Sequence, residues 1–161
     1  MGKLTKKQIW ELLEDVKDPE IPVVSVVEMG IVREVAIEGD QVIVHMTPTF
    51  SGCPALQAIQ TDIRQHLLAN GAAQVEVEVV LSPAWTSDWI SGPARQKLRE
   101  FGLAPPIRQM GRISLDDLQP ATCPYCGSQD TILKNSFGPT LCRAIYVCNH
   151  CQQPFEQFKA I

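Results

Sequence analysis

The chain has 161 residues, of which 45% are hydrophobic and 20% are charged, and its formal net charge is −4. These values exclude a disordered chain and fit one domain with its own core plus a small appendage. The acidic balance disfavours a general nucleic-acid binder, which needs a basic stripe to neutralise phosphates. Because no apolar run has the length of a transmembrane helix and no signal-peptide pattern follows Met1, we expect a cytoplasmic protein that does not bind membranes.

An amphipathic helix is predicted near the start of the chain. Thr5 and Gln8 have the spacing of a capping box. Apolar residues then recur at helical spacing, at Ile9, Leu12, Leu13 and Val16. We expect the helix to end at Asp18-Pro19, because the residue before a proline is pushed out of the α region.

Two strands and a second helix are predicted next. The strands cover residues 31–37 and 42–46, and a turn at residues 38–40 joins them. Pro54 suits the first turn of the helix, and Asn70-Gly71 ends it. The helix positions expected to face inward are Leu56, Ile59, Ile63 and Leu67.

A third strand completes an α+β domain. Apolar residues alternate with Glu76 and Glu78, which gives the strand one buried and one solvated face. The apolar positions are Val75, Val77, Val79 and Leu81. The order α-β-β-α-β implies a small three-stranded sheet covered by helices on one side. We place this domain at residues 1–105.

The segment after the sheet contains two tryptophans. Trp85 and Trp89 lie four residues apart beside Asp88, and Pro93 suits the start of a short helix. Buried tryptophans would form a hydrophobic latch, whereas an exposed pair would mark a protein interface. Prolines and glycines then predict a linker at residues 106–120.

The clearest motif is a pair of Cys-x-x-Cys sequences separated by twenty-one residues. Each pair suits a tight knuckle, Gly127 supplies the positive φ that a knuckle needs, and the intervening length allows a β-hairpin. The four thiolates would close a tetrahedral structural Zn²⁺ site with no open position for catalysis. The expected ligands are Cys123, Cys126, Cys148 and Cys151.

We place this zinc ribbon at residues 121–161, with strands at 131–136, 143–147 and 155–158. Two disulfides are the alternative, but they are disfavoured because thiols inside cells normally stay reduced. Iron would also suit four cysteines and would make the tail a redox centre.

Cys53 is the other candidate for chemistry, since it stands between a predicted strand and a helix N-terminus. The helix dipole and free amides there favour a thiolate, which would act as a nucleophile, a redox thiol or a metal ligand. The alternative is a small buried hydrophobe near a helix cap. Asp18, Glu20 and Glu28 form an acidic cluster that would either help to hold iron or simply end a helix with its charges in water.

Several motifs together carry a family resemblance. They are DPEIPVVS at 18–25, MGIVR at 29–33, T…CP at 49–54 and WTSDW at 85–89. These motifs resemble the iron–sulfur assembly family that includes SufT. With FGLAPP at 101–106 and the cysteine ribbon, the chain is most similar to the PaaD family, also called PaaJ, the accessory members of the phenylacetyl-CoA epoxidase (phenylacetate-CoA oxygenase) system. One departure is Glu28, where many relatives carry Asp.

The resemblance implies an accessory or maturation role in aerobic phenylacetate degradation. The expected partners are the di-iron oxygenase and the iron–sulfur flavin reductase of the epoxidase, whose metal centres need loading. Cys53 would be a transfer ligand for transient iron or an Fe–S cluster, with Asp18 and Glu20 tuning it. The ribbon would recognise the client together with Trp85, Asp88 and Trp89. A homodimer is permitted but not required.

Two other functions remain open at this stage. One is a free-standing thiol enzyme that uses Cys53, although the sequence offers no clear base, since His45 and His66 read as ordinary surface or packing residues. The other is a nucleic-acid-binding ribbon, but residues 121–161 carry three basic and two acidic side chains, a net charge of only +1. No Glu-x-x-His pair or dinucleotide fingerprint is present, so we do not expect the chain to catalyse epoxidation by itself.

Overall fold

A computed structural model describes residues 3–49, 54–106, 121–139 and 143–159. The chain forms two compact units. The N-terminal unit contains residues 1–85 and 89–94, and the ribbon unit contains residues 86–88 and 95–161. None of the helices in the described ranges has the length and apolar character needed to cross a membrane. Most of the predicted linker lies outside the described residues, and the predicted domain bounds stay a prediction.

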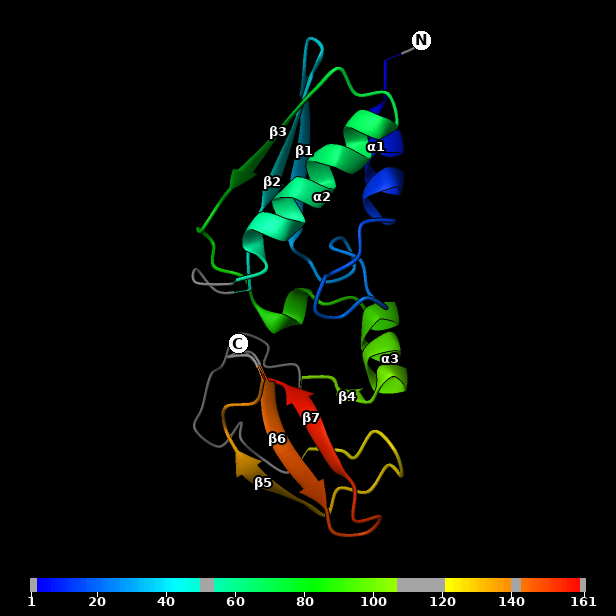
Figure 1. The fold of residues 1–161 in the computed structure, drawn as a ribbon, viewed down its shortest axis with the longest axis vertical. Helices are drawn as coiled ribbons and strands as arrows, with labels where there is room; N and C mark the ends of the chain where they lie inside the picture. The colour runs from blue at the N-terminus through cyan, green and yellow to red at the C-terminus, as the bar shows by residue number, and fades with distance from the viewer. Residues whose placement is uncertain (1–2, 50–53, 107–120, 140–142, 160–161) are drawn as a thin grey trace. The chain divides into compact units, whose positions relative to one another are not determined.

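The N-terminal unit has the predicted order α-β-β-α-β. Its elements are α1 (Lys6–Leu13), β1 (Val32–Glu38), β2 (Gln41–Met46), α2 (Leu56–Ala69) and β3 (Gln74–Val79). The sheet has the order β1-β2-β3, with β1 antiparallel and β3 parallel to the central strand β2. Both helices lie on the same side of this sheet, and α1 contacts α2 and β1 while α2 contacts β3 (Figure 1). The α+β fold class is therefore confirmed.

The predicted capping box starts α1. The Thr5 hydroxyl accepts a hydrogen bond from the Gln8 amide at 3.2 Å, and the Gln8 side chain accepts one from the Thr5 amide at 2.9 Å. The prediction that this helix runs to Asp18 is wrong, because α1 ends at Leu13. The following chain instead pairs with a later segment: the Val26 amide donates to the Val16 carbonyl at 2.9 Å.

The core of the N-terminal unit lies between the helices and the sheet. Its central residues alternate along the strands and recur along α2, namely Val35, Val42, Val44, Met46, Ile59, Ile63, Leu67 and Val77. The predicted inward face of β3 is only partly correct, since Val77 is buried but Val79 and Leu81 are 37% and 57% exposed. Among the described strands, β3 is an edge strand with a sheet neighbour on one side only, and Leu81 lies beyond its end.

The ribbon unit contains a second sheet. Its strands are β4 (Leu103–Ala104), β5 (Thr131–Asn135), β6 (Arg143–Cys148) and β7 (Pro154–Phe158). Their order is β4-β7-β6-β5, in which β6 is antiparallel to both neighbours and β4 is parallel to β7. The last three strands match the predicted ribbon. The short strand β4 was not predicted, because two residues carry no periodic signal.

Two short helices precede this sheet in the chain. They are the 3₁₀ helix η1 (Ser87–Trp89) and α3 (Gly92–Phe101). The α3 helix begins one residue before Pro93, as the sequence predicts, and the Ser91 hydroxyl accepts a hydrogen bond from the Ala94 amide at 3.2 Å. In the ribbon sheet, Tyr146 and Phe155 stack with ring centroids 5.7 Å apart and form the centre of a small core.

Candidate metal centre and the N-terminal loop

The first cysteine pair lies on a tight knuckle. The Cys123 amide donates to the Ser128 carbonyl at 2.8 Å, and the Gly127 amide donates back to the Cys123 carbonyl at 2.9 Å. Gly127 has a φ of 76°, in the left-handed region that glycine adopts without a Cβ penalty. The structure therefore gives Gly127 the conformation that the sequence predicts.

The second pair lies on a knuckle with the same hydrogen-bond pattern. The Cys148 amide donates to the Gln153 carbonyl, and the Gln152 amide donates to the Cys148 carbonyl, both at 3.0 Å. Gln152 occupies the position that Gly127 has in the first knuckle, and its φ is 63°. Its side-chain amide donates to the Asn149 carbonyl at 2.7 Å, which partly offsets the unfavourable backbone conformation.

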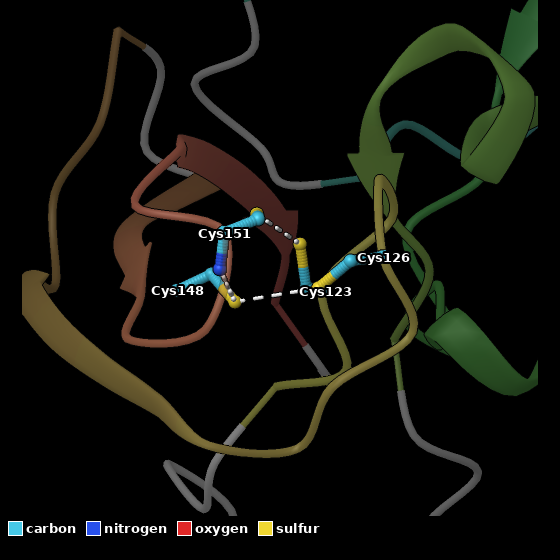
Figure 2. A group of neighbouring side chains, drawn as sticks. All are labelled: Cys123, Cys126, Cys148 and Cys151. Carbon is cyan, nitrogen blue, oxygen red and sulfur yellow. Dashed lines mark hydrogen bonds between the residues drawn. The ribbon is translucent and has the colours of Figure 1, made fainter.

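The two knuckles bring the four predicted ligands together (Figure 2). All four sulfur atoms lie within 4.8 Å of one another. The Sγ atoms of Cys123 and Cys151 are 3.7 Å apart, and those of Cys126 and Cys148 are 3.6 Å apart. A tetrahedral zinc site with Zn–S bonds of about 2.3 Å places its sulfurs about 3.8 Å apart, so this donor set fits a four-thiolate metal site. The four cysteines are free thiols and not the alternative disulfides.

The thiols of this cluster differ in their readiness to ionise. The Cys151 amide and then the His150 amide stabilise the Cys148 thiolate and lower the pKa of Cys148 to about 6. The Gln153 amide lowers the pKa of Cys151, but burial and the neighbouring thiols outweigh it and raise that pKa to about 12. One thiolate therefore forms readily, whereas a complete set needs the positive charge of a metal ion.

Asp18 holds the turn that follows the first helix. Its Oδ1 atom accepts hydrogen bonds from the Glu20 amide at 2.8 Å and the Ile21 amide at 3.2 Å. Asp18 is only 7% exposed. This disagrees with the alternative in which the residue simply ends a helix and keeps its charge in water. Glu20 is half-buried. Cys53, which we expected beside these carboxylates, lies outside the described residues.

Glu28 closes the next turn together with Ser25. The Ser25 amide donates to Glu28 Oε2 at 2.9 Å, and the Glu28 amide donates to Ser25 Oγ at 3.0 Å. Ser25 Oγ also donates to Glu14 Oε2 at 2.9 Å. This reciprocal pair has the Ser-x-x-Glu spacing of a capping box, a signal that is present in the sequence but did not enter our prediction. Among the described residues, only the four cysteines form a group of three or more ligands close enough to hold a metal ion.

Both tryptophans of the motif at residues 85–89 contact the N-terminal unit to which they belong. The Trp85 side chain is 3% exposed and its indole nitrogen donates to the Met29 carbonyl at 2.9 Å. The half-buried Trp89 lies beneath the Arg33 guanidinium, which is 3.6 Å from the ring centroid. Trp85 is therefore the buried latch. The partner interface formed by Trp85, Asp88 and Trp89 stays a prediction. Its accessible surface would come from the half-buried Asp88 and Trp89.

His45 lies on the open face of the first sheet. Its Nε2 is 3.1 Å from Glu78 Oε2 and its Nδ1 is 3.6 Å from Glu34 Oε2, on the two neighbouring strands. His66 Nε2 on α2 is 3.9 Å from an Asp15 carboxylate oxygen. His45 thus lies between two surface carboxylates, and His66 Nε2 is buried near a third, which agrees with their reading as ordinary surface or packing residues.

Two family models match this chain, one in its N-terminal part and one in its C-terminal part. Residues 6–79 match the family model described as iron–sulfur cluster assembly protein, and residues 110–159 match the PaaD zinc beta ribbon domain. The crystal structure of a DUF59 domain of unknown function from Bacillus anthracis is 33% identical, covers 58% of this chain and 90% of its own, and has a TM-score of 0.54. The structure of a conserved hypothetical protein from Thermotoga maritima is 33% identical to this chain and has a TM-score of 0.52. The match covers 61% of this chain and 98% of the Thermotoga chain.

Two curated relatives extend these matches. A protein from Escherichia coli strain K12, named as a putative subunit of 1,2-phenylacetyl-CoA epoxidase, is 43% identical over 155 residues, which is 96% of this chain and 92% of the relative. An Fe-S protein maturation auxiliary factor from Porphyromonas gingivalis is 34% identical over 96 residues, 58% of this chain and 90% of the relative.

The fold and the cysteine site together define an iron–sulfur-assembly-type domain followed by a zinc ribbon. Because the match to the Escherichia coli epoxidase protein extends over nearly the whole of both sequences, the chain belongs to the PaaD family. The resemblance inferred from the sequence motifs is thereby confirmed.

Proposed function

We propose that the protein is a maturation component of a phenylacetyl-CoA 1,2-epoxidase system in aerobic phenylacetate degradation, and that it assists the assembly of an iron or iron–sulfur centre in that system. The observation that carries this proposal is the pairing of two likenesses in one chain. Nearly the whole chain is similar to a protein named as a putative subunit of the epoxidase, and more than half of the chain is similar to proteins named as Fe-S maturation factors. The protein is not expected to be catalytic alone.

In this proposal the ribbon, at residues 121–161, binds zinc as a structural ion. Four thiolates fill a tetrahedral site, so no coordination position is left for a substrate or a water nucleophile. The ribbon core is small, with one cluster of seven buried residues around Tyr146 and Phe155, and metal binding would supply much of its folding free energy. The ion holds the two knuckles together and thereby shapes the surface around them.

Metal handling belongs to the N-terminal domain, at residues 1–105, and Cys53 is its transfer ligand. Soft thiolate and carboxylate oxygen are both ligands that iron accepts. Asp18 is committed to two backbone amides, so its contribution would be to fix the loop and to place a buried negative charge in it. Glu20 is half-buried and follows in the same turn. The clients would be the di-iron oxygenase and the iron–sulfur flavin reductase.

The decisive experiment co-expresses the epoxidase subunits with wild-type protein or with Cys53→Ser at limiting iron. We expect the purified oxygenase or reductase to lose much of its iron and its epoxidation activity with the variant. Cys142→Ser is the matched control, since it removes the other cysteine that lies outside the two Cys-x-x-Cys pairs. Full client activity with Cys53→Ser would exclude the transfer role.

A companion pair of variants separates the charge of Asp18 from its structural role. Asp18→Asn keeps an oxygen that accepts from the two amides, whereas Asp18→Ala removes the acceptor. If the charge matters for iron, Asp18→Asn reduces client iron while the protein stays folded. If Asp18→Asn supports normal loading and only Asp18→Ala fails, Asp18 acts through the loop structure alone. Elemental analysis after anaerobic purification, with one zinc per chain expected in both variants, reports on the ribbon independently.

A further inference from the structure

The ribbon unit has a pocket of about 400 Å³ that the metal site alone does not explain. Its walls come from the end of α3, the first cysteine knuckle, β6 and β7. The residues that carry the argument are Phe101, Tyr125, Arg143, Phe155 and Glu156. All of them belong to the ribbon unit.

Two aromatic walls of this pocket are unusually accessible. Phe101 is 47% exposed and Tyr125 is 58% exposed, although both rings line the pocket. Large aromatic side chains gain free energy when they leave water, and Tyr, Phe and Arg are enriched where proteins meet. Phe101 and Tyr125 therefore give this hollow the accessible aromatic surface that is typical of a protein interaction site.

The charged residues in the pocket wall neutralise each other. Arg143 Nη1 lies 2.9 Å from Glu156 Oε2, and the two side chains are only 12% and 32% exposed. An acidic ligand would compete with Glu156 for the guanidinium, and a basic ligand would compete with Arg143 for the carboxylate. Either competition would weaken an ion pair that is mostly out of water and has no net charge to attract a charged ligand. The pocket therefore suits a neutral, apolar group.

The exposure of the walls also indicates what kind of molecule brings that group. Sites for small molecules enclose most of their ligand, whereas two walls of this pocket are themselves about half exposed. A free aromatic molecule would remain partly in water there. A side chain on a folded partner would not, because the partner surface around it covers Phe101 and Tyr125 at the same time.

We propose that this pocket receives an aromatic side chain from a partner protein. The pocket follows from the ribbon structure itself, and only the identification of the partner as a component of the epoxidase rests on the proposed function. Tyr125 links the pocket to the metal, since it lies between Cys123 and Cys126 in the first knuckle. A Cβ atom at Gly102 would lie 3.0 Å from the Tyr125 hydroxyl, so the tyrosine ring is held closely against the α3–β4 turn.

The test titrates the full-length, zinc-loaded protein with N-acetyl-phenylalaninamide and follows the backbone amides by NMR. We expect weak saturable binding, with shifts centred on Gly102, Ile145 and Glu156. The corresponding N-acetylated amides of lysine and glutamate should bind to the protein less well than N-acetyl-phenylalaninamide. Phe101→Ala and Tyr125→Ala should weaken binding about five- to tenfold, the loss expected for one aromatic contact. Phe137→Ala is the control, because Phe137 is 61% exposed in the same unit but does not line the pocket. Equal binding of the charged amides, or equal loss in Phe137→Ala, would overturn the proposal.

A second arm measures binding of purified epoxidase subunits to the same variants by calorimetry. Loss of binding in Phe101→Ala and Tyr125→Ala but not in Phe137→Ala supports the client as the partner. Client binding that all variants retain overturns this assignment of the pocket. If the wild-type protein binds none of the epoxidase subunits while the phenylalanine amide still binds the pocket, the proposed function fails and the pocket as an aromatic-binding site stands.

Discussion

The indole nitrogen of Trp85 donates a hydrogen bond to the carbonyl oxygen of Met29 at 2.9 Å, across 56 positions of sequence. Both residues are essentially buried, at 3% and 0% exposure. This bond joins two motifs of the family resemblance, WTSDW and MGIVR, and both bonded residues belong to the N-terminal unit. The tryptophan is thus part of the structure that holds the loop at residues 25–30.

Replacing Trp85 with phenylalanine tests this bond. The ring of Phe fills part of the site but has no donor, so a buried carbonyl loses its partner. We expect the free energy of unfolding of the N-terminal unit to decrease by about 1–3 kcal/mol, measured by urea denaturation. Trp10→Phe is the matched control, because Trp10 is half-buried and its indole makes no hydrogen bond to the described residues. Equal losses in both variants would show that ring size, not the hydrogen bond, matters.

Gly30 lies against Trp89 so closely that a side chain cannot be added. A Cβ at Gly30 would lie 2.7 Å from Trp89 Cβ and 2.8 Å from its carbonyl oxygen. Gly39 has a similar positive φ, 61° against 70°, but its Cβ would meet no atom of the described residues within 4 Å. Gly39→Ala should lower the free energy of unfolding by about 1 kcal/mol, because alanine is strained in the left-handed backbone conformation. Gly30→Ala should cost at least about 3 kcal/mol because a steric overlap is added.

Thermal or urea unfolding of the two alanine variants measures this difference directly. Both variants change the same atoms and the same backbone region, so their difference isolates the approach of Trp89. Similar stabilities would mean that the loop at residues 25–30 shifts away at little cost, and the latch would then be much softer than the structure indicates.

Local patterns in the sequence were enough for most elements. The capping box at Thr5, the turn at Gly39 and the valine alternation of the first sheet each involve residues within a few positions of one another. The two Cys-x-x-Cys pairs are equally local, and their spacing alone predicts the cluster that the structure contains. Short-range periodicity and cap chemistry therefore define which elements form.

Other features depend on contacts between distant segments. The end of α1 at Leu13 follows from pairing of Val16 with Val26, which no helical pattern reveals. The buried Asp18 lies in the same loop, where its amide donates to the Val24 carbonyl at 3.0 Å. The strand β4 forms because Leu103 and Ala104 pair with β7, about fifty positions later in the chain. The spacing of Ser25 and Glu28 is that of a capping box. Because no helical pattern follows it in the sequence, the spacing alone does not predict the turn.

Gln152 offers a substitution that should stabilise the ribbon. It adopts a left-handed φ of 63° at the position where the first knuckle has Gly127. Gln152→Gly removes the steric cost of that conformation but also removes the bond from its side chain to the Asn149 carbonyl. We expect a net gain of up to about 1 kcal/mol in the free energy of unfolding of the zinc-loaded ribbon. Gln153→Gly is the control at the next exposed position, where added flexibility should lower stability by about 0.5–1 kcal/mol. A loss of stability in both variants would contradict the argument.

The zinc affinity of the ribbon should fall as the pH falls, because the metal binds thiolates and must displace protons. The pKa of Cys151 is raised to about 12 and that of Cys126 is raised, so both thiols carry protons at neutral pH before metal binds. The pKa of Cys148 is lowered to about 6, so this thiol is already ionised at neutral pH and releases no proton there. As the pH drops below about 6, Cys148 also becomes protonated, and metal binding must then displace one proton more.

The logarithm of the zinc affinity should therefore decrease with decreasing pH and do so more steeply below about pH 6. Competition with a chromophoric chelator between pH 5 and 8 measures both slopes. Cys126→Ser should reduce the slope near neutral pH by about one proton, since it removes a thiol that must ionise. Cys148→Ser should remove the steepening below pH 6, because the group that titrates there is gone. A slope that stays constant through pH 6 in the wild-type protein would show that the amides of Cys151 and His150 do not stabilise the Cys148 thiolate before metal binds.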